Sequence, residues 1–365
     1  MMSNFIHLQT KSHYSISCGL PKTNEIVDKA IEAGMKAVAL ADKNTFFGLV
    51  KFYNYALSKG IKPICGVDFD VKVNNGYTNL ILLAKNKKGL EKLFKLSTES
   101  FVQSGSEKRS IPEKDILNDA DNLVCIIPTS SNNLRNLALK KDEDSIVNLY
   151  VKYQKAFTED LFIGVSNFSE NGYDPAAAFA CNTAKKNNIS VVAINDVLFL
   201  EKEDHLAHQA KVAINNATLL KDEIDNPNVS SEQYFKTEEE LTKYHELEPL
   251  RNTFEVAKLC NVFLEEGQYY LPSYEVQENK SLSEHLEDLS RNKLKEYLDQ
   301  HNDLDKNLYQ ERLEKELKII TEKGYPGYFL IVMDFVKWAK GQEIPVGPGR
   351  SEEHTSELQS PDHLV

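Results

Sequence analysis

Short apolar runs alternate with amphipathic helical segments through the first half of the chain, and this alternation constrains the fold more than any other feature. Residues 37–41 (AVALA), 123–127 (LVCII) and 161–165 (LFIGV) have the length and composition of buried strands. Between such runs, apolar residues recur at helical spacing, as in residues 26–31. Strands that are apolar throughout and separated by helices predict a parallel sheet with helices on both faces.

Further segments continue the same series. The other strand-like runs are residues 5–8, 62–71, 80–84 and 190–194, and further helical segments are residues 46–59 and 90–96. A series of strand–helix units this long is also compatible with a barrel. Periodicity alone leaves the open sheet and the barrel as alternatives.

The second half is predicted to be helical and to form a separate region. Residues 269–272 (YYLP) interrupt the helical pattern, which places a boundary near this point. Residues 282–298 and 304–320 are then predicted to form two charged amphipathic helices. Residues 327–338 are much more apolar, and one stripe of this segment is expected to be buried. The stripe consists of Phe329, Val332, Phe335 and Val336.

Composition narrows the classes of function. The formal net charge of −12 argues against a surface that binds DNA over most of its area, but it is compatible with a local basic groove. The five cysteines are far apart and no CxxC pair occurs, so we expect no zinc ribbon and a reducing, cytoplasmic environment. Neither a secretion signal nor an apolar run of about 18 residues is evident, so we expect no membrane span.

Three passages resemble parts of known proteins. Residues 5–19 (FIHLQTKSHYSISCG) and 34–71 (beginning GMKAVALADKN) resemble motifs of the polymerase-and-histidinol-phosphatase (PHP) domain, a distorted α/β barrel. Residues 324–350 (GYPGYFLIVMDFVKWAKGQEIPVGPGR) resemble the start of the palm in the alpha subunit of bacterial DNA polymerase III. The resemblance implies a PHP-type distorted (β/α) barrel in residues 1–270, followed by a helical start of the polymerase palm in residues 271–349.

The metal site of PHP domains is mostly substituted in this chain. At ligand positions of the family, the resemblance places the non-matching residues Gln9, Lys11, Lys43 and Leu198. Carboxylates remain at Asp42, Asp68 and Asp196. A lysine ammonium has no lone pair for a metal ion at neutral pH, and it repels cations. We therefore expect no PHP metal cluster and, in its place, ion pairs of the two lysines with these carboxylates.

The histidines do not suggest a second metal site. His7 matches a histidine of the PHP motif, but beside Gln9 it cannot form a site alone. His205 and His208 have the i, i+3 spacing of a helical metal-binding pair, but no third ligand accompanies them. We interpret these two residues and His13 as surface or hydrogen-bonded histidines.

A glycine-rich loop follows the apolar segment. In the polymerase family a Gly-Pro-Gly-Arg loop lies beside the incoming nucleotide, so the resemblance assigns nucleotide contacts to Gly347, Gly349 and Arg350. Glycines let backbone N–H groups approach phosphate oxygens, and arginine adds a charge-assisted hydrogen bond. The family continues with Gly-Ser, whereas this chain continues with residues 351–353 (SEE), whose two glutamates would repel a triphosphate.

The last residues, 350–365 (RSEEHTSELQSPDHLV), do not resemble the family. They resemble a translated sequencing-library adapter, so we expect a non-native tail. The catalytic aspartates of the family, which hold Mg²⁺ in the full-length polymerase, are expected beyond the end of this chain. The fragment itself is therefore expected to contain no catalytic residue and no cofactor.

The resemblance implies part of a replicative DNA polymerase alpha subunit, whose full-length form performs template-directed DNA synthesis. In this fragment the PHP domain would be an inactive scaffold that binds the proofreading exonuclease subunit. Primer–template DNA, the sliding clamp and clamp-loader subunits would be partners of the full-length protein alone. Two other classes stay open: a stand-alone metal-dependent PHP phosphoesterase, and a non-enzymatic adaptor with the same fold.

Overall fold

The structure, a computed structural model, divides into two compact units, Met1–Leu264 and Glu265–Val365, which are described separately. It describes residues 5–16, 18–74, 76–102, 108–166, 174–225, 227, 229–268, 270, 272–276, 280–301 and 303–347. Among these residues, no helix has the length and apolar character needed to cross a membrane.

The first unit is built on one curled sheet, with strand order β1-β2-β3-β5-β6-β7 and with β4 paired to β2. The strands are β1 Ala37–Lys43, β2 Lys62–Val73, β3 Gly76–Ala84, β4 Ile111–Pro112, β5 Leu123–Pro128, β6 Leu161–Val165 and β7 Ser190–Ala193. The prediction of a parallel sheet is wrong for β3, which runs antiparallel to both β2 and β5. The reason is the connection, because β3 begins three positions after Val73, and so short a link joins only antiparallel neighbours.

The N-terminal segment joins the two edges of this sheet. On one side, the N–H of Ala39 in β1 donates to the carbonyl of His7 at 2.9 Å. On the other side, the N–H of Val197, after β7, donates to the carbonyl of Gln9 at 3.1 Å. The sheet therefore curls into the distorted α/β barrel expected from the resemblance. Residues 5–8 are not the regular strand that was predicted, because their backbone bonds are shared between two neighbours at isolated positions.

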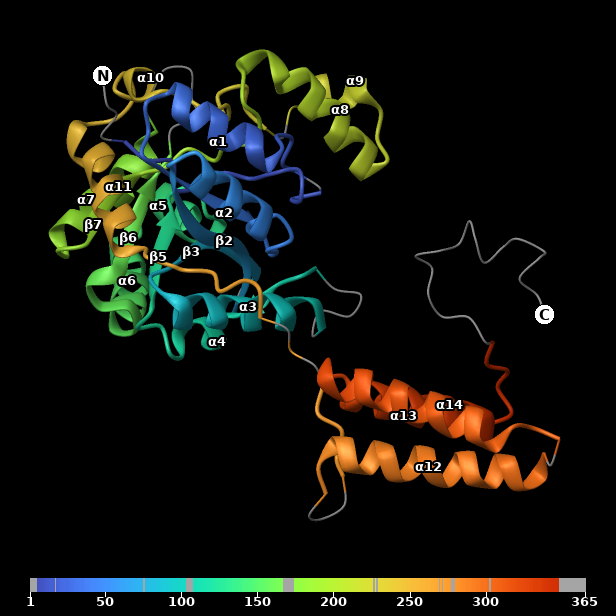
Figure 1. Cartoon of the computed structure of the whole chain (residues 1–365). Helices are drawn as coiled ribbons and strands as arrows, with labels where there is room; N and C mark the ends of the chain where they lie inside the picture. Colours follow the sequence, from blue (N-terminus) through green and yellow to red (C-terminus); the bar gives the residue numbers. More distant parts are fainter. Residues whose placement is uncertain are drawn as a thin grey trace. The chain divides into compact units, whose positions relative to one another are not determined.

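Helices surround this sheet, except that α8 and α9 lie beside each other away from the strands (Figure 1). They are α1 Thr23–Glu32, α2 Leu49–Ser58, α3 Lys87–Val102, α4 Glu113–Leu117, α5 Asn132–Leu139, α6 Glu143–Phe157, α7 Pro175–Lys186, α8 His205–Asn216, α9 Leu220–Asp225, α10 Glu238–Leu241 and α11 Leu247–Leu259. The sheet separates two buried cores. Because successive strand residues point to opposite faces, Leu80 and Leu82 of β3 enter one core while Ile81 and Leu83 enter the other.

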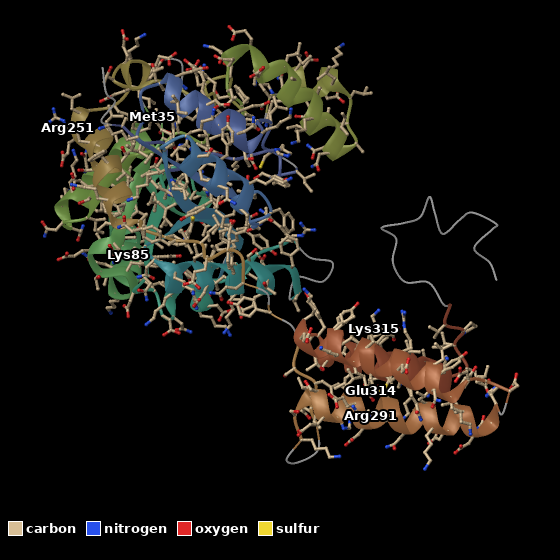
Figure 2. The ribbon with its side chains drawn as sticks, in the orientation of Figure 1. Met35, Lys85, Arg251, Arg291, Glu314 and Lys315 are labelled. Atoms are coloured by element: carbon tan, nitrogen blue, oxygen red, sulfur yellow. The ribbon has the colours of Figure 1, made fainter. Side chains whose placement is uncertain are left out.

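In the described residues of the second unit there are three helices, α12 Leu282–Gln300, α13 Lys306–Glu322 and α14 Pro326–Gly341. Arg291 of α12 points toward Glu314 of α13 (Figure 2) and donates two hydrogen bonds to its carboxylate, at 2.8 and 3.0 Å. The small core of the unit is Leu286, Leu317 and Leu330.

The apolar stripe of α14 is not buried as predicted. Phe329 is 44% exposed and Phe335 is 48% exposed, whereas Leu330 is fully buried. The reason is that α12 and α13 offer α14 one apolar surface, and Leu330 packs into it. Phe329 and Phe335 therefore face away from the core of this unit, whereas Val332 and Val336 are half-buried.

Candidate functional site

A cavity of about 780 Å³ lies where the N-terminal segment meets the strands on either side of it. Its wall includes Lys43 at the end of β1, Asp68 and Asp70 of the neighbouring β2, and Asp196 after the end of β7. Lys11 belongs to the segment that joins these two sides. Because the carboxyl ends of neighbouring parallel strands meet at one edge of a sheet, residues far apart in the sequence converge here.

Lys11 is buried and joins carboxylates from both sides of the cavity. Its Nζ lies 3.0 Å from Asp68 Oδ2 and also forms an ion pair with Asp196. Gln9 Nε2 donates to the same Asp68 oxygen at 3.1 Å. Burial alone would lower the pKa of Lys11, but the two carboxylates outweigh it and raise the pKa above its usual value. Lys11 is therefore a cation at neutral pH.

Lys43 forms a second cationic centre on the opposite side of Asp68. Its Nζ lies 3.1 Å from Asp68 Oδ1 and 3.2 Å from Asp70 Oδ1. Burial alone would raise the pKa of Asp68, but Lys11 and Lys43 outweigh it and hold that pKa well below its usual range. The expected ion pairs of Lys11 with Asp68 and Asp196, and of Lys43 with Asp68, are confirmed.

Asp42 does not form the lysine ion pair that was expected for it. Its Oδ1 accepts hydrogen bonds from the Ser12 N–H at 2.7 Å and from Ser15 Oγ at 2.6 Å, and its Oδ2 accepts one from Ser12 Oγ at 2.8 Å. Burial raises the pKa of Asp42, although these hydrogen bonds oppose the rise. The oxygens of Asp42 face the loop after Lys11. Hydroxyl and amide groups of this loop therefore donate the hydrogen bonds to Asp42, in place of a lysine ammonium.

These contacts do not fit the metal cluster of a PHP domain. The two oxygens of Asp68 are each held by an ammonium group, and Asp196 is held by Lys11. An ammonium group in these positions supplies no lone pair and repels a divalent ion. Within the part of the chain that the structure describes, no group of three or more His, Cys, Asp and Glu side chains is placed to hold a metal ion. Instead, the ion pairs of Lys11 and Lys43 link the N-terminal segment and β1 to β2 and to the chain after β7.

The histidines make hydrogen bonds to backbone carbonyls. His7 is fully buried between the rings of Phe5 and Phe235, with its Nε2 2.8 Å from the Lys236 carbonyl oxygen. Burial lowers the pKa of His7 to about 3, so its ring is neutral. His205 and His208 contact the carbonyl oxygens of Val229 and Cys18, at 2.9 and 2.7 Å, which confirms their interpretation as hydrogen-bonded residues.

Three charged residues of the cavity, Asp70, Lys108 and Arg109, were missed by the sequence reasoning. Asp70 binds Lys43 and also lies 3.1 Å from Lys108 Nζ. A signal for Asp70 was present, because it lies two residues after Asp68 in a strand and so shares its face. Lys108 carried no signal, since it lies outside every motif. Leu198, the predicted loss of a histidine ligand, is buried and lines the cavity as an apolar residue.

The glycine-rich loop is described only at its start. Gly347 is exposed, and an added Cβ atom would meet no heavy atom within 4 Å. Gly349, Arg350 and the tail of residues 350–365 lie outside the described residues.

Two family models match the chain. The PHP domain matches residues 7–168, and the bacterial DNA polymerase III alpha NTPase domain matches residues 284–353. A solved structure of an amidohydrolase from Chromobacterium violaceum is similar to 53% of this chain and 87% of its own, with a TM-score of 0.41 and 13% identity. That likeness is too weak to bear on fold or function.

The curated relatives are similar over nearly the whole chain. DNA polymerase III subunit alpha of Buchnera aphidicola (subsp. Schizaphis graminum) is 35% identical over 360 residues, covering 96% of this chain and 31% of that protein. The subunits of Escherichia coli K12 and Vibrio cholerae are 34% and 33% identical, each covering 95% of this chain and 31% of the relative. The chain thus spans about a third of the length of these relatives. It combines a PHP domain with part of the DNA polymerase III alpha NTPase domain, as in the N-terminal third of DNA polymerase III alpha subunits.

Proposed function

We propose that the chain is the N-terminal part of a replicative DNA polymerase alpha subunit and that its PHP domain is a non-catalytic scaffold. The observation that carries the second half of this proposal is the network of Lys11, Lys43, Asp68 and Asp196. It uses two of the three remaining family carboxylates, Asp68 and Asp196, for ion pairs that hold the barrel closed. Similarity to polymerase alpha subunits over 96% of the chain supports the first half.

The polymerase chemistry belongs to the full-length protein. In this proposal residues 1–270 are the PHP domain, residues 271–349 begin the palm, and residues 350–365 are a non-native tail. Gly347, Gly349 and Arg350 would lie beside an incoming nucleotide. Template-directed synthesis in the cytoplasm would require Mg²⁺ held by carboxylates outside this chain, together with primer–template DNA, the sliding clamp and the clamp loader.

The partner of the scaffold would be the proofreading exonuclease subunit. A scaffold needs a rigid surface, and the buried ion pairs on both sides of the N-terminal segment support rigidity at this point of the barrel. The test is a binding measurement between the purified chain and the purified exonuclease subunit. Saturable binding is expected, and an absence of binding at micromolar concentrations would contradict the scaffold role.

The stand-alone phosphoesterase is the main alternative, and a hydrolysis assay separates it from the scaffold. The scaffold predicts no hydrolysis of a model phosphodiester above the rate without protein, with or without Mn²⁺. Hydrolysis that requires Mn²⁺ and is lost in an Asp42→Ala variant would favour the phosphoesterase. The Asp42 variant is informative because Asp42 is a family carboxylate that no lysine pairs with in this chain.

A further inference from the structure

Large apolar side chains surround the mouth of the cavity. Ile16, Phe47 and Phe101 line it and are 71%, 62% and 36% exposed. The ring centroids of Phe47 and Phe101 lie 5.9 Å apart, which brings the start of α2 next to the end of α3. Phe47 and Phe101 thus form an exposed pair of apolar rings at the mouth. Exposed apolar surface of this kind marks interaction sites.

Cations border these apolar side chains. The guanidinium of Arg109 lies 4.3 Å from the centre of the Phe101 ring, and Lys108 has a side chain that is 54% exposed. On the α2 side, Lys51 Nζ lies 2.9 Å from the hydroxyl of Tyr14, which also lines the cavity. Lys108 also pairs with Asp70 at 3.1 Å, so Arg109 and Lys51 contribute most of the positive charge of this border. The chain as a whole carries a net charge of −12. A positive border favours a partner with carboxylates at the rim of the contact.

The composition of the mouth favours a protein segment over a nucleic acid. Bases stack on aromatic rings, whereas Ile16, the most exposed of the three apolar residues at the mouth, is aliphatic. The floor of the cavity offers no excess of positive charge to a polyanion, because Asp68, Asp70 and Asp196 neutralise its lysines. An apolar peptide side chain packs equally well on aliphatic and aromatic surface.

We infer that the mouth of the cavity is a docking surface for a partner segment in which an apolar anchor is flanked by acidic residues. The anchor packs between Ile16, Phe47 and Phe101, and the acidic residues contact Lys51, Lys108 and Arg109. The inference rests on the scaffold function proposed above, and it assigns this contact to the proofreading exonuclease subunit. The Lys–Asp network below the mouth keeps the two sides of the docking surface in register.

Two substitutions test the two halves of this surface. Phe47→Glu places a charge at the centre of the apolar patch, and Leu139→Glu is its control, since Leu139 is also 62% exposed and lies outside the lining of the cavity. Lys108→Glu/Arg109→Glu reverses the charge of the border. Lys140→Glu/Lys141→Glu is the matched control, because these are likewise consecutive exposed cations.

The measurement is the Kd of the chain for the purified exonuclease subunit, by isothermal titration calorimetry, with circular dichroism to confirm folding. We expect Phe47→Glu and the Lys108/Arg109 reversal each to raise Kd at least tenfold, and the two controls to stay within about twofold of the wild type. The effect of the charge reversal should shrink at high salt.

The outcomes separate the two proposals. If the wild type binds and both test variants bind equally well, the docking surface lies elsewhere and the scaffold function stands. If the wild type does not bind, both proposals fail. A parallel titration with single-stranded oligothymidine tests whether the mouth binds nucleic acid instead. Oligothymidine binding that is lost in Phe47→Glu would assign the mouth to nucleic acid and overturn the inference.

Discussion

Replacing Lys11 by methionine tests whether the Lys–Asp network holds the barrel together. Methionine keeps most of the volume of lysine but removes the charge, which leaves Asp196 without its lysine and Asp68 with Lys43 alone. Breaking a buried ion pair by removing one partner typically costs 3–5 kcal/mol. Asp196 has a side chain that is 23% exposed and Asp68 keeps one partner, so we expect the lower end, about 3 kcal/mol.

Urea denaturation measures this loss in the full chain. The single tryptophan is Trp338 of α14, so tryptophan fluorescence follows the helical unit, while circular dichroism follows both units. With a slope of about 3 kcal/mol per molar urea for a domain of this size, the midpoint of the barrel transition should fall by about 1 M. The fluorescence transition should stay in place, because Lys11 belongs to the other unit.

Two further variants sharpen the result. Lys36→Met, at an exposed lysine, is the control and should change the free energy of unfolding by less than about 0.5 kcal/mol. In Lys11→Met/Asp196→Asn, both partners of one pair lose their charge, so we expect the double variant to recover about 1–3 kcal/mol relative to the sum of the single losses. A Lys11→Met protein as stable as Lys36→Met would refute the reasoning.

Three more predictions follow from other parts of the molecule. Burial lowers the pKa of His7 from 6.5 to about 3, so the stabilisation from its neutral ring is complete above pH 6.5 and is lost as the pH falls toward 3. His7→Gln should therefore flatten this part of the curve of unfolding free energy against pH. An unchanged curve would contradict the assignment. In the helical unit, Arg291→Ala should cost less than about 1 kcal/mol because its ion pairs are exposed, whereas Leu330→Ala should cost about 2–5 kcal/mol; equal shifts of the fluorescence transition would contradict both. A chain shortened to residues 1–271 should be more soluble than the whole chain, because α14 exposes Phe335 and Trp338; equal soluble fractions on expression would count against this.

Local patterns in the sequence predicted most of the strands, because apolar runs such as residues 161–165 coincide with β6. The direction of β3 was not predicted, since it depends on the short link after Val73 rather than on apolar pattern. The closure through residues 5–11 depends on hydrogen bonds to the chain after β7, and no local pattern reveals bonds over such a distance. The stripe of α14 looked buried because periodicity shows which residues share a face, not whether another element covers it.

The candidate site was predictable where charge left few choices. Buried lysines need carboxylate partners, so the pairing of Lys11 and Lys43 followed from the resemblance and from electrostatics together. The partners of Asp42 were not predictable, because Ser12 and Ser15 are residue types that occur on any surface. The ion pair of Lys108 with Asp70 depends on tertiary structure alone, so no local sequence pattern predicts it.

The central claim is that ion pairs of lysine and aspartate take the place of a metal cluster in this PHP domain. Isothermal titration calorimetry of the full chain with Mn²⁺ and Zn²⁺ at neutral pH tests it most directly. The account predicts no saturable binding at micromolar concentrations and a melting temperature that does not change between EDTA and excess metal. Stoichiometric binding that raises the melting temperature and is lost in Asp42→Ala or Asp68→Ala would contradict it.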